Sequence, residues 1–449
     1  MDPKDVEKLL AKAQKPGKDA MVMHPHYKGK IQITAKCAVR TLADFAIWYT
    51  PGVAKPCLDI RDNPEKVFEH TNKGNMVAVV SDGTRVLGLG DIGPEAGLPV
   101  MEGKGLLFKY LGGVDAFPIC LDTKDPDKII ETVLLMQPSF GGVNLEDISQ
   151  PKCFYVLDEL RKRARIPVWH DDQQGTAAII YAGLINALKF VGKKIKDTKL
   201  VFIGAGASNI RAANVCIAGG FEPGNIILVD SKDTIHKGRT ELAEKYKQKW
   251  ELAQITNKDQ VKGGPLEAMR GADAVVGAST PGPGTILPDW IKGMAKDPVV
   301  FPCANPVPEI WPWEAKEAGA VVVATGRSDF PNQVNNSLGF PGIFRGTLDV
   351  RAKTITDGMC IAAAKELAKV AEDKGLREDY IIPSMDEWEV FPREAAAVGM
   401  QAIKEGVAGI TNVKYEDIMK NAERIIKEAR ESVQMLMKEG FISKVPEGV

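Results

Sequence analysis

From about residue 199 onward, short apolar runs rich in Val and Ile alternate with longer amphipathic stretches. Apolar runs of this length that end in turn residues are typical of parallel strands buried on both faces. The runs are KLVFIGAG, NIILVD, DAVVGAS, PVVFPCA and AVVVATG. Because strands of this kind alternate with helices, the pattern predicts a doubly wound parallel sheet in an α/β fold.

The first half of the chain has a different pattern, in which glycine-rich loops separate the apolar runs. MVAVVSDG, VDAFPICLD and GGVNLED predict strands, and DKIIETVLLMQ predicts a helix. The tail YEDIMKNAERIIKEARESVQMLMKEG predicts a long charged helix with an apolar stripe. We therefore expect an N-terminal α/β domain over residues 1–172, a second α/β domain over 173–385, and a helical segment over 386–449 that packs on the other domains or on a partner subunit.

Length and composition limit the class of protein. A chain of 449 residues is long enough for two or three domains. Its formal net charge of −1 gives no basic excess for a nucleic-acid partner. The 7 cysteines are irregularly spaced, which fits a reducing compartment. The charged start MDPKDVEKLL does not resemble an export signal, and the uncharged run 173–188 is shorter than the roughly 20 residues of a membrane span. We expect a cytoplasmic protein without a membrane partner.

A glycine-rich turn in VFIGAGASNIRAANV predicts a dinucleotide site. Gly204 follows a predicted strand and permits a tight turn, and Gly206 allows a pyrophosphate to approach the N-terminus of the next helix. Asn209 occupies the third fingerprint position in place of glycine or alanine. The second domain is therefore expected to be Rossmann-like, with cofactor contacts from Gly204, Ala205, Gly206, Ala207, Ser208 and Asn209. A glycine turn in a non-binding α/β domain is the alternative.

The residues after the next strand bear on the choice of cofactor. Asp230 ends the run IILVD, where an acidic side chain binds the adenine ribose hydroxyls of NAD. Lys232, Lys237 and Arg239 follow closely, and such cations receive the 2′-phosphate of NADP. The sequence leaves both NAD and NADP open.

Two pairs of adjacent carboxylates follow predicted strands. Glu146 and Asp147 occur in NLEDIS, and Asp171 and Asp172 occur in VWHDDQQG. Ligands bind at the carboxyl ends of strands in open α/β sheets, and converging carboxylates suit Mg²⁺ or Mn²⁺. Zinc is disfavoured because no cluster of Cys or His accompanies them. For either pair taken alone, a solvated loop or a helix N-cap is the favoured interpretation. The two pairs at equivalent positions leave a metal site and a structural role equally open.

Eight motifs occur in the order found in malic enzymes, and the chain resembles the short form of that family. They are WYTPGVAKPCLDI, SDGTRVLGLGDIG, PVMEGKGLLFKY, NLEDIS, WHDDQQGTAA, IGAGAS, CANPVPEI and NNSLGFPG. The motifs span most of residues 28–385. The resemblance implies oxidation of malate by NAD or NADP, decarboxylation with a divalent metal, and protonation of enolpyruvate to pyruvate. It also implies that the N-terminal domain holds substrate and metal, and that the protein is a homodimer or homotetramer.

The resemblance assigns roles position by position. It implies that Lys104 is the general base, Tyr49 the general acid, and Asp171 the carboxylate that pairs with the lysine. The metal ligands would be Glu146, Asp147 and Asp172. Arg85, Asn305 and Asn336 would bind malate. Separately from the resemblance, the position of Asp230 and Lys232 after the predicted strand makes them candidate cofactor contacts.

Two other functions remain as alternatives. One is a different α/β dehydrogenase, related to the amino-acid or methylenetetrahydrofolate dehydrogenases, which uses a lysine without a metal cluster. The other is a nucleotide-sensing regulator that has lost catalysis. The carboxylates Glu146, Asp147 and Asp172 discriminate against the first, and the occupied catalytic positions argue against the second.

Overall fold

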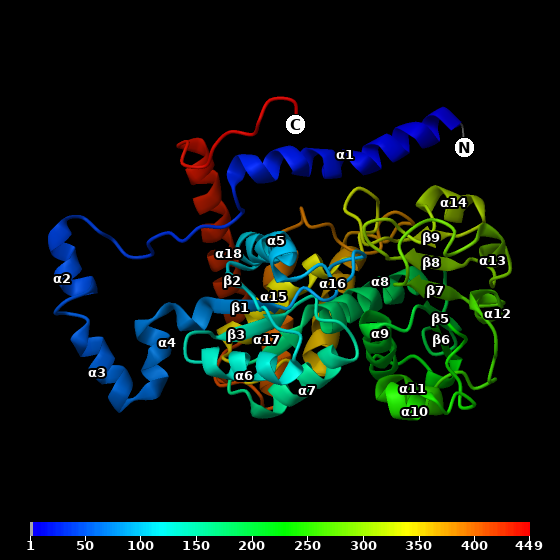
Figure 1. The fold of residues 1–449 in the computed structure, drawn as a ribbon, viewed down its shortest axis with the longest axis horizontal. Helices are drawn as coiled ribbons and strands as arrows, with labels where there is room; N and C mark the ends of the chain where they lie inside the picture. Colours follow the sequence, from blue (N-terminus) through cyan, green and yellow to red (C-terminus); the bar gives the residue numbers. More distant parts are fainter. Residues whose placement is uncertain (1–2) are drawn as a thin grey trace.

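The fold contains two parallel sheets, each surrounded by helices (Figure 1). A computed structural model describes residues 3–449. The first sheet has the order β2-β1-β3-β4 and the second the order β6-β5-β7-β8-β9. The strands of the first sheet are β1 (Met76–Ser81), β2 (Asp115–Cys120), β3 (Gly142–Leu145) and β4 (Val168–His170). Those of the second are β5 (Leu200–Ile203), β6 (Ile226–Val229), β7 (Ala274–Gly277), β8 (Val299–Pro302) and β9 (Val322–Val323). All of the predicted strands and the α/β class are confirmed.

Each sheet has a point where the strand order reverses, between β1 and β3 in the first sheet and between β5 and β7 in the second. Loops diverge there at the carboxyl ends of the strands, which leaves a crevice where ligands bind. Leu145 of β3 pairs with both Val80 and His170, so the residues that follow β1, β3 and β4 emerge at one edge. This register brings the two predicted acidic pairs to the same edge.

Helices cover both sheets and connect them. Those after the strands of the first sheet are α5 (Pro94–Gly112), α6 (Pro126–Met136) and α7 (Lys152–Arg163). The uncharged run that we predicted to be too short for a membrane span forms most of α8 (Thr176–Phe190). This helix is largely buried and packs against α9 and α16. The helices that surround the second sheet are α9 (Ala207–Ala218), α10 (Leu242–Lys245), α11 (Lys247–Ile255), α12 (Pro265–Met269), α13 (Pro288–Lys292) and α14 (Pro312–Glu317). Among the described residues, no helix is both long and apolar enough to span a membrane.

Four C-terminal helices return to the first sheet. They are α15 (Phe340–Asp349), α16 (Asp357–Asp373), α17 (Val390–Lys404) and α18 (Tyr415–Lys438). The rings of Phe340 and Phe344 on α15 lie 4.6 and 5.1 Å from Phe108 of α5, centroid to centroid. Helix α18 packs against α17 and α5 of the same chain, which buries Ile418, Ala422, Ile426 and Ala429 of its apolar stripe, whereas Met435 and Met437 near its end are exposed. Aromatic burial of this kind holds α15 against α5, and the other C-terminal helices pack on α15, α5 and α8 and on one another.

The N-terminal segment lies largely outside this body. Helix α1 (Pro3–Tyr27) contacts the chain's C-terminal residues, since Tyr27 Oη donates to the carbonyl of Ser443 at 3.0 Å. Figure 1 shows α2 (Phe45–Trp48) and α3 (Ala54–Asp62) projecting from the body, followed by α4 (Val67–His70), which leads to β1. We call residues 31–62 the N-terminal arm.

Candidate active site

Three carboxylates meet at the carboxyl ends of β3 and β4. One ligand oxygen from each of Glu146, Asp147 and Asp172 lies within 4.8 Å of the other two. Glu146 and Asp147 are buried, and Asp172 is partly buried. Asp147 adopts a left-handed backbone conformation with φ 55°, which turns the chain sharply after β3. Its amide donates to Asp172 Oδ2 at 2.9 Å, which ties the two loops together.

The lysine predicted to be the base lies beside this cluster. Lys104 projects from α5 and is 7% exposed. Its Nζ lies 2.5 Å from Asp171 Oδ2 and 3.1 Å from Glu146 Oε1. Burial opposes the lysine's positive charge, but Asp171 and Glu146 outweigh it and raise the pKa of Lys104 above its ordinary value. The two adjacent aspartates therefore point to different partners, Asp171 to the lysine and Asp172 to the carboxylate trio.

The trio carries more negative charge than its surroundings neutralise. Burial, followed by repulsion from Asp172, raises the pKa of Asp147 to about 8. Burial also raises the pKa of Glu146 well above its ordinary value, against the opposing effect of Lys104. Asp147 Oδ2 is buried without a hydrogen-bond partner. A buried oxygen of this kind, in a cluster of oxygen ligands, fits a hard divalent cation.

The sequence interpretation missed three residues that support these groups. Asn144 Nδ2 donates to Glu146 Oε2 at 2.8 Å, and Trp169 Nε1 donates to Asp171 Oδ1 at 3.1 Å. Each lies two positions before the carboxylate it holds, and side chains two apart share one face of a strand. That spacing was a usable signal for both. Phe340, whose ring centroid lies 4.3 Å from the Lys104 ammonium, comes from a distant helix and left no such signal.

The predicted malate-binding residues surround the same edge. Arg85 follows β1 and is exposed. Burial raises the pKa of Asp172, and the positive charge of Arg85 is among the nearby groups that oppose this rise. Asn336 packs against the turn formed by Asp171–Gly175, because a Cβ added at Gly175 would lie 3.2 Å from Asn336 Cβ. Asn305 lies in the loop after β8 and is partly buried. Asn305 reaches the loop that carries Arg85, because a Cβ added at Gly88 would lie 2.4 Å from the Asn305 carbonyl.

Tyr49 is the exception among the predicted catalytic residues. It follows α2 on the N-terminal arm and is 71% exposed. Figure 1 shows that the arm projects away from α5, the helix that carries Lys104. A single chain therefore does not bring Tyr49 to the site.

The nucleotide fingerprint forms the expected strand-turn-helix unit. Gly204 has φ +91°, and a Cβ there would lie 2.6 Å from the carbonyl of Ala278, so only glycine fits. Gly206 precedes α9, whose first turn contains Ala207 and Ser208, and Ala205 is buried between the two glycines. Asn209 is also buried, and its Nδ2 donates to the carbonyls of Ile203 and Gly204 at 3.0 and 2.8 Å. The third fingerprint residue therefore fixes the turn through its side chain, which faces the backbone of the loop.

Asp230 follows β6 at the same edge and is already engaged by cations. Its Oδ1 accepts from Arg239 Nη1 at 2.8 Å and from the amide of Lys232 at 2.9 Å, and Lys249 Nζ lies 3.3 Å from Oδ2. Burial opposes its charge, but these donors lower the pKa of Asp230 to about 2. Lys237, further along the loop, is exposed.

We expect Asp230→Asn to lower the free energy of unfolding at pH 7 by about 1–2 kcal/mol. Because the folded-state pKa lies below the ordinary value of 3.8, ionised Asp230 stabilises the fold above about pH 4, and this contribution is lost as the pH falls toward 2. Urea midpoints at pH 7 and pH 3 should therefore differ less for the variant than for the natural chain. Asp289→Asn, which removes an exposed ion pair with Lys292, is the control and should change the midpoints little. Equal pH dependence of the urea midpoint in the variant and the natural chain would contradict the stabilising role of ionised Asp230.

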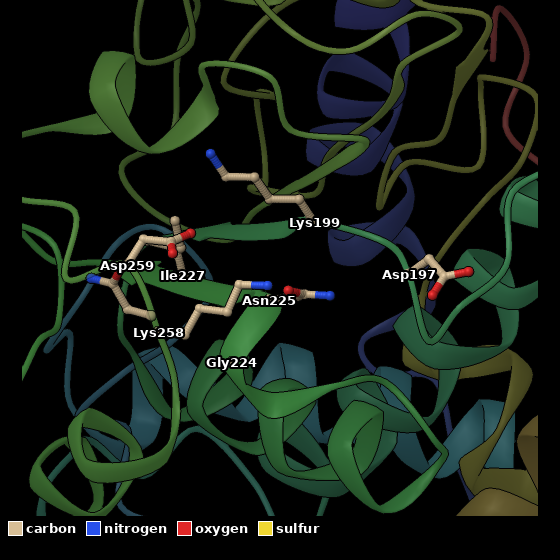
Figure 2. A pocket seen from close by; sticks show the side chains of 8 residues that line it. Asp197, Lys199, Gly224, Asn225, Ile227, Lys258 and Asp259 are labelled. Atoms are coloured by element: carbon tan, nitrogen blue, oxygen red, sulfur yellow. The ribbon is translucent and has the colours of Figure 1, made fainter.

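A hollow of about 190 Å³ lies at the opposite edge of the second sheet (Figure 2). Lys199 and Asn225, which line it, immediately precede β5 and β6, whereas Gly204 and Asp230 follow those strands. The hollow therefore lies at the amino ends of the strands, away from the crevice where α/β sheets bind nucleotides.

The fold and this site define a class of α/β protein with two parallel sheets, one followed by a glycine-rich turn typical of dinucleotide sites and the other flanked by a lysine held by carboxylates. The family model "Malic enzyme, N-terminal domain" matches residues 27–161, and "Malic enzyme, NAD binding domain" matches residues 173–407. The chain therefore belongs to the malic enzyme family, as its motifs predicted.

Similar proteins agree over most of the chain. The bifunctional malic/malolactic enzyme of Bacillus subtilis is 49% identical over 91% of this chain and 98% of that protein. The NAD-dependent malic enzyme of Geobacillus stearothermophilus is 50% identical over 86% of this chain and 80% of that protein. The crystal structure of the malic enzyme of Entamoeba histolytica superposes with a TM-score of 0.97 at 51% identity, covering 98% of this chain and 92% of that one.

Proposed function

We propose that this protein catalyses the divalent-metal-dependent oxidative decarboxylation of malate to pyruvate and CO₂, with reduction of NAD or NADP. The observation that carries the proposal is the contact of Lys104 with Asp171 and Glu146, next to the trio of Glu146, Asp147 and Asp172. A base beside a metal-binding carboxylate cluster is the arrangement that oxidation of a hydroxyl followed by loss of CO₂ requires. The family membership supports the same reaction.

The residues present fit a divalent metal. Glu146, Asp147 and Asp172 would hold it, and the unpartnered Asp147 Oδ2 would gain a ligand. When bound, Mg²⁺ or Mn²⁺ would supply a Lewis acid for the oxygens of malate and would offset the carboxylate charge that raises the pKa of Lys104.

The chain's own groups would divide the remaining work. Lys104 Nζ would take the proton of the C2 hydroxyl of malate while the C2 hydride passes to the nicotinamide ring. Arg85 would bind a malate carboxylate, and Asn305 and Asn336 would orient the substrate through their amides. Gly204–Asn209 and Asp230 with Lys232 would hold the cofactor at the carboxyl edge of the second sheet.

Tyr49 would supply its proton to the site of a second copy of the chain. The arm around it exposes Phe45, Ile47, Trp48 and Tyr49, with exposed fractions of 48%, 57%, 48% and 71%. Contiguous apolar side chains on a projecting segment are typical of a surface that another subunit covers. A homodimer or homotetramer in which each arm reaches a neighbouring Lys104 would complete every site with an acid for C3 of enolpyruvate.

The proposal is tested by assaying malate oxidation with NAD and NADP in parallel, each with Mn²⁺, with Mg²⁺, and after exhaustive chelation. We expect reduced cofactor and pyruvate in equal amounts with metal, and loss of turnover on chelation that added metal reverses. Turnover that survives chelation would favour a lysine dehydrogenase without a metal. No turnover with either cofactor in the presence of Mn²⁺ would favour a nucleotide-sensing protein.

A further inference from the structure

A buried carboxylate outside the lysine cluster joins two loops of the second sheet. Glu309 lies after β8 and is 0% exposed. Its Oε1 accepts from the amide and the hydroxyl of Ser279 at 2.9 and 3.1 Å, and its Oε2 accepts from the amide of Ala304 at 2.9 Å. Ser279 follows β7 and Ala304 follows β8, so one side chain links the carboxyl ends of two adjacent strands.

The loop after β7 contacts the nucleotide turn. A Cβ added at Gly204 would lie 2.6 Å from the carbonyl of Ala278 and 2.9 Å from Ser279 Cβ, so these backbones are in close contact. The loop after β7 also binds the loop after β8 directly, because the amide of Gly282 donates to the carbonyl of Val307 at 3.1 Å. A shift of Ser279 would therefore move the wall against which the glycine turn rests.

The loop after β8 contacts the substrate side. A Cβ added at Gly88, in the loop that carries Arg85, would lie 2.4 Å from both the carbonyl of Asn305 and Pro281 Cγ. Asn305 directly follows Ala304, whose amide Glu309 holds. The two loops thus reach across the crevice to the first domain.

We infer that Glu309 is a positioning residue that sets the distance between the cofactor and substrate sides of the site by holding the loops at Ser279 and Ala304 together. It is not a proton donor, since both of its oxygens are buried and occupied by donors from the chain. The inference rests on the proposed function, because it assigns the two loops to the cofactor and to malate. Burial raises the pKa of Glu309, and the amides of Ala304 and Ser279 oppose this rise by donating to its carboxylate. Hydrogen bonds to an ionised carboxylate are stronger than those to a neutral group, so the two loops are held most firmly when Glu309 is ionised.

The test compares Glu309→Gln with the natural chain. Glutamine keeps the shape but turns an amide group toward an N–H of Ser279 or Ala304, so at least one hydrogen bond is lost. We expect the dissociation constant for NADH or NADPH, measured by fluorescence without malate, to rise about ten-fold, with a similar rise in KM for malate. The kcat for decarboxylation of added oxaloacetate with Mn²⁺ should stay within about two-fold, because Lys104 and the carboxylate trio are held by other contacts.

Glu394→Gln is the matched control. Glu394 on α17 is also 0% exposed, but its carboxylate lies against Gly342 of α15, away from both loops. The Glu394→Gln variant should leave cofactor affinity unchanged. This result would show that the effect of Glu309→Gln comes from the loops it holds and not from the loss of a buried carboxylate as such. Ser279→Ala removes only the hydroxyl contact and should raise the same constants about two-fold, so a poorly folding Glu309→Gln chain does not end the test.

Unchanged cofactor affinity in both Glu309→Gln and Ser279→Ala would overturn the inference. An equal loss of oxaloacetate decarboxylation and cofactor binding in Glu309→Gln would also overturn it, because it would indicate general disruption of the fold. Failure of the proposed function is distinct, since the natural chain itself would then not oxidise malate.

Discussion

Replacing Lys104 with alanine is expected to lower kcat for malate oxidation by about 10³-fold. Lys104 is the only cation among the described residues that forms ion pairs with both Asp171 and Glu146, so its loss removes the base and leaves two buried carboxylates without a counter-charge. Decarboxylation of added oxaloacetate and tautomerisation of enolpyruvate should also slow, because each of these reactions also transfers a proton at the position of the Lys104 ammonium. Steady-state assays with malate and with oxaloacetate measure the two effects.

Lys109→Ala is the matched control for this variant. Lys109 lies one turn further along α5 and pairs with Asp115 at 2.8 Å, with 41% of its side chain exposed. It should keep nearly all activity. The Lys104→Ala chain should still bind NADH within about two-fold of the natural chain, since the glycine turn belongs to the other sheet. Malate turnover within a few-fold of the natural chain would exclude Lys104 as the base.

Replacing Tyr49 with phenylalanine is expected to lower kcat about 10²-fold, with enolpyruvate protonation affected most. The sharper result comes from mixing this variant with Lys104→Ala. If Tyr49 acts in a second copy, a mixed dimer contains one site with both defects and one site with neither. Random pairing of equal amounts makes half of the dimers mixed, so about a quarter of the natural activity should return.

Co-expression with two affinity tags isolates the mixed dimers directly. Lys104→Ala mixed with a chain that carries both substitutions is the control, and it should stay inactive because no intact site can form. Absence of recovery in isolated mixed dimers of the two single variants would show that Tyr49 does not complete a neighbouring site. Tautomerisation of enolpyruvate at the natural rate by Tyr49→Phe would identify another group as the acid.

Most of the strands and the location of the acidic edge were predictable because both depend on local pattern. Val-rich runs identify buried parallel strands, and residues that directly follow such strands converge on one edge of the sheet. Glu146, Asp147, Asp171 and Asp172 all satisfy this rule, which is why their proximity could be expected before any coordinates. The split of Asp171 and Asp172 between lysine and trio came from the family resemblance, and the observed contacts have the same geometry.

What the sequence did not reveal depends on contacts between distant segments. Phe340 reaches Lys104 from α15. Glu309 binds Ser279, 30 residues earlier in the chain, and Ala304, 5 residues earlier, and no local periodicity marks Phe340 or Glu309 in the sequence. The exposed position of Tyr49 depends on the path of the N-terminal arm, which propensity does not determine. Asn209 seemed a departure from the glycine fingerprint because the pattern describes side-chain size, whereas this side chain works through hydrogen bonds to Ile203 and Gly204.

The left-handed backbone at Asp147 limits which residues this position can hold as the protein diverges or is engineered. Most side chains are strained at φ 55°, and glycine, asparagine and aspartate tolerate it best. Of these three, only aspartate carries a charge. Glutamate, the usual conservative replacement for aspartate, would keep the charge but would be strained in this left-handed turn. Few residues can therefore replace Asp147, and asparagine is the substitution that keeps the shape of the loop while removing its charge.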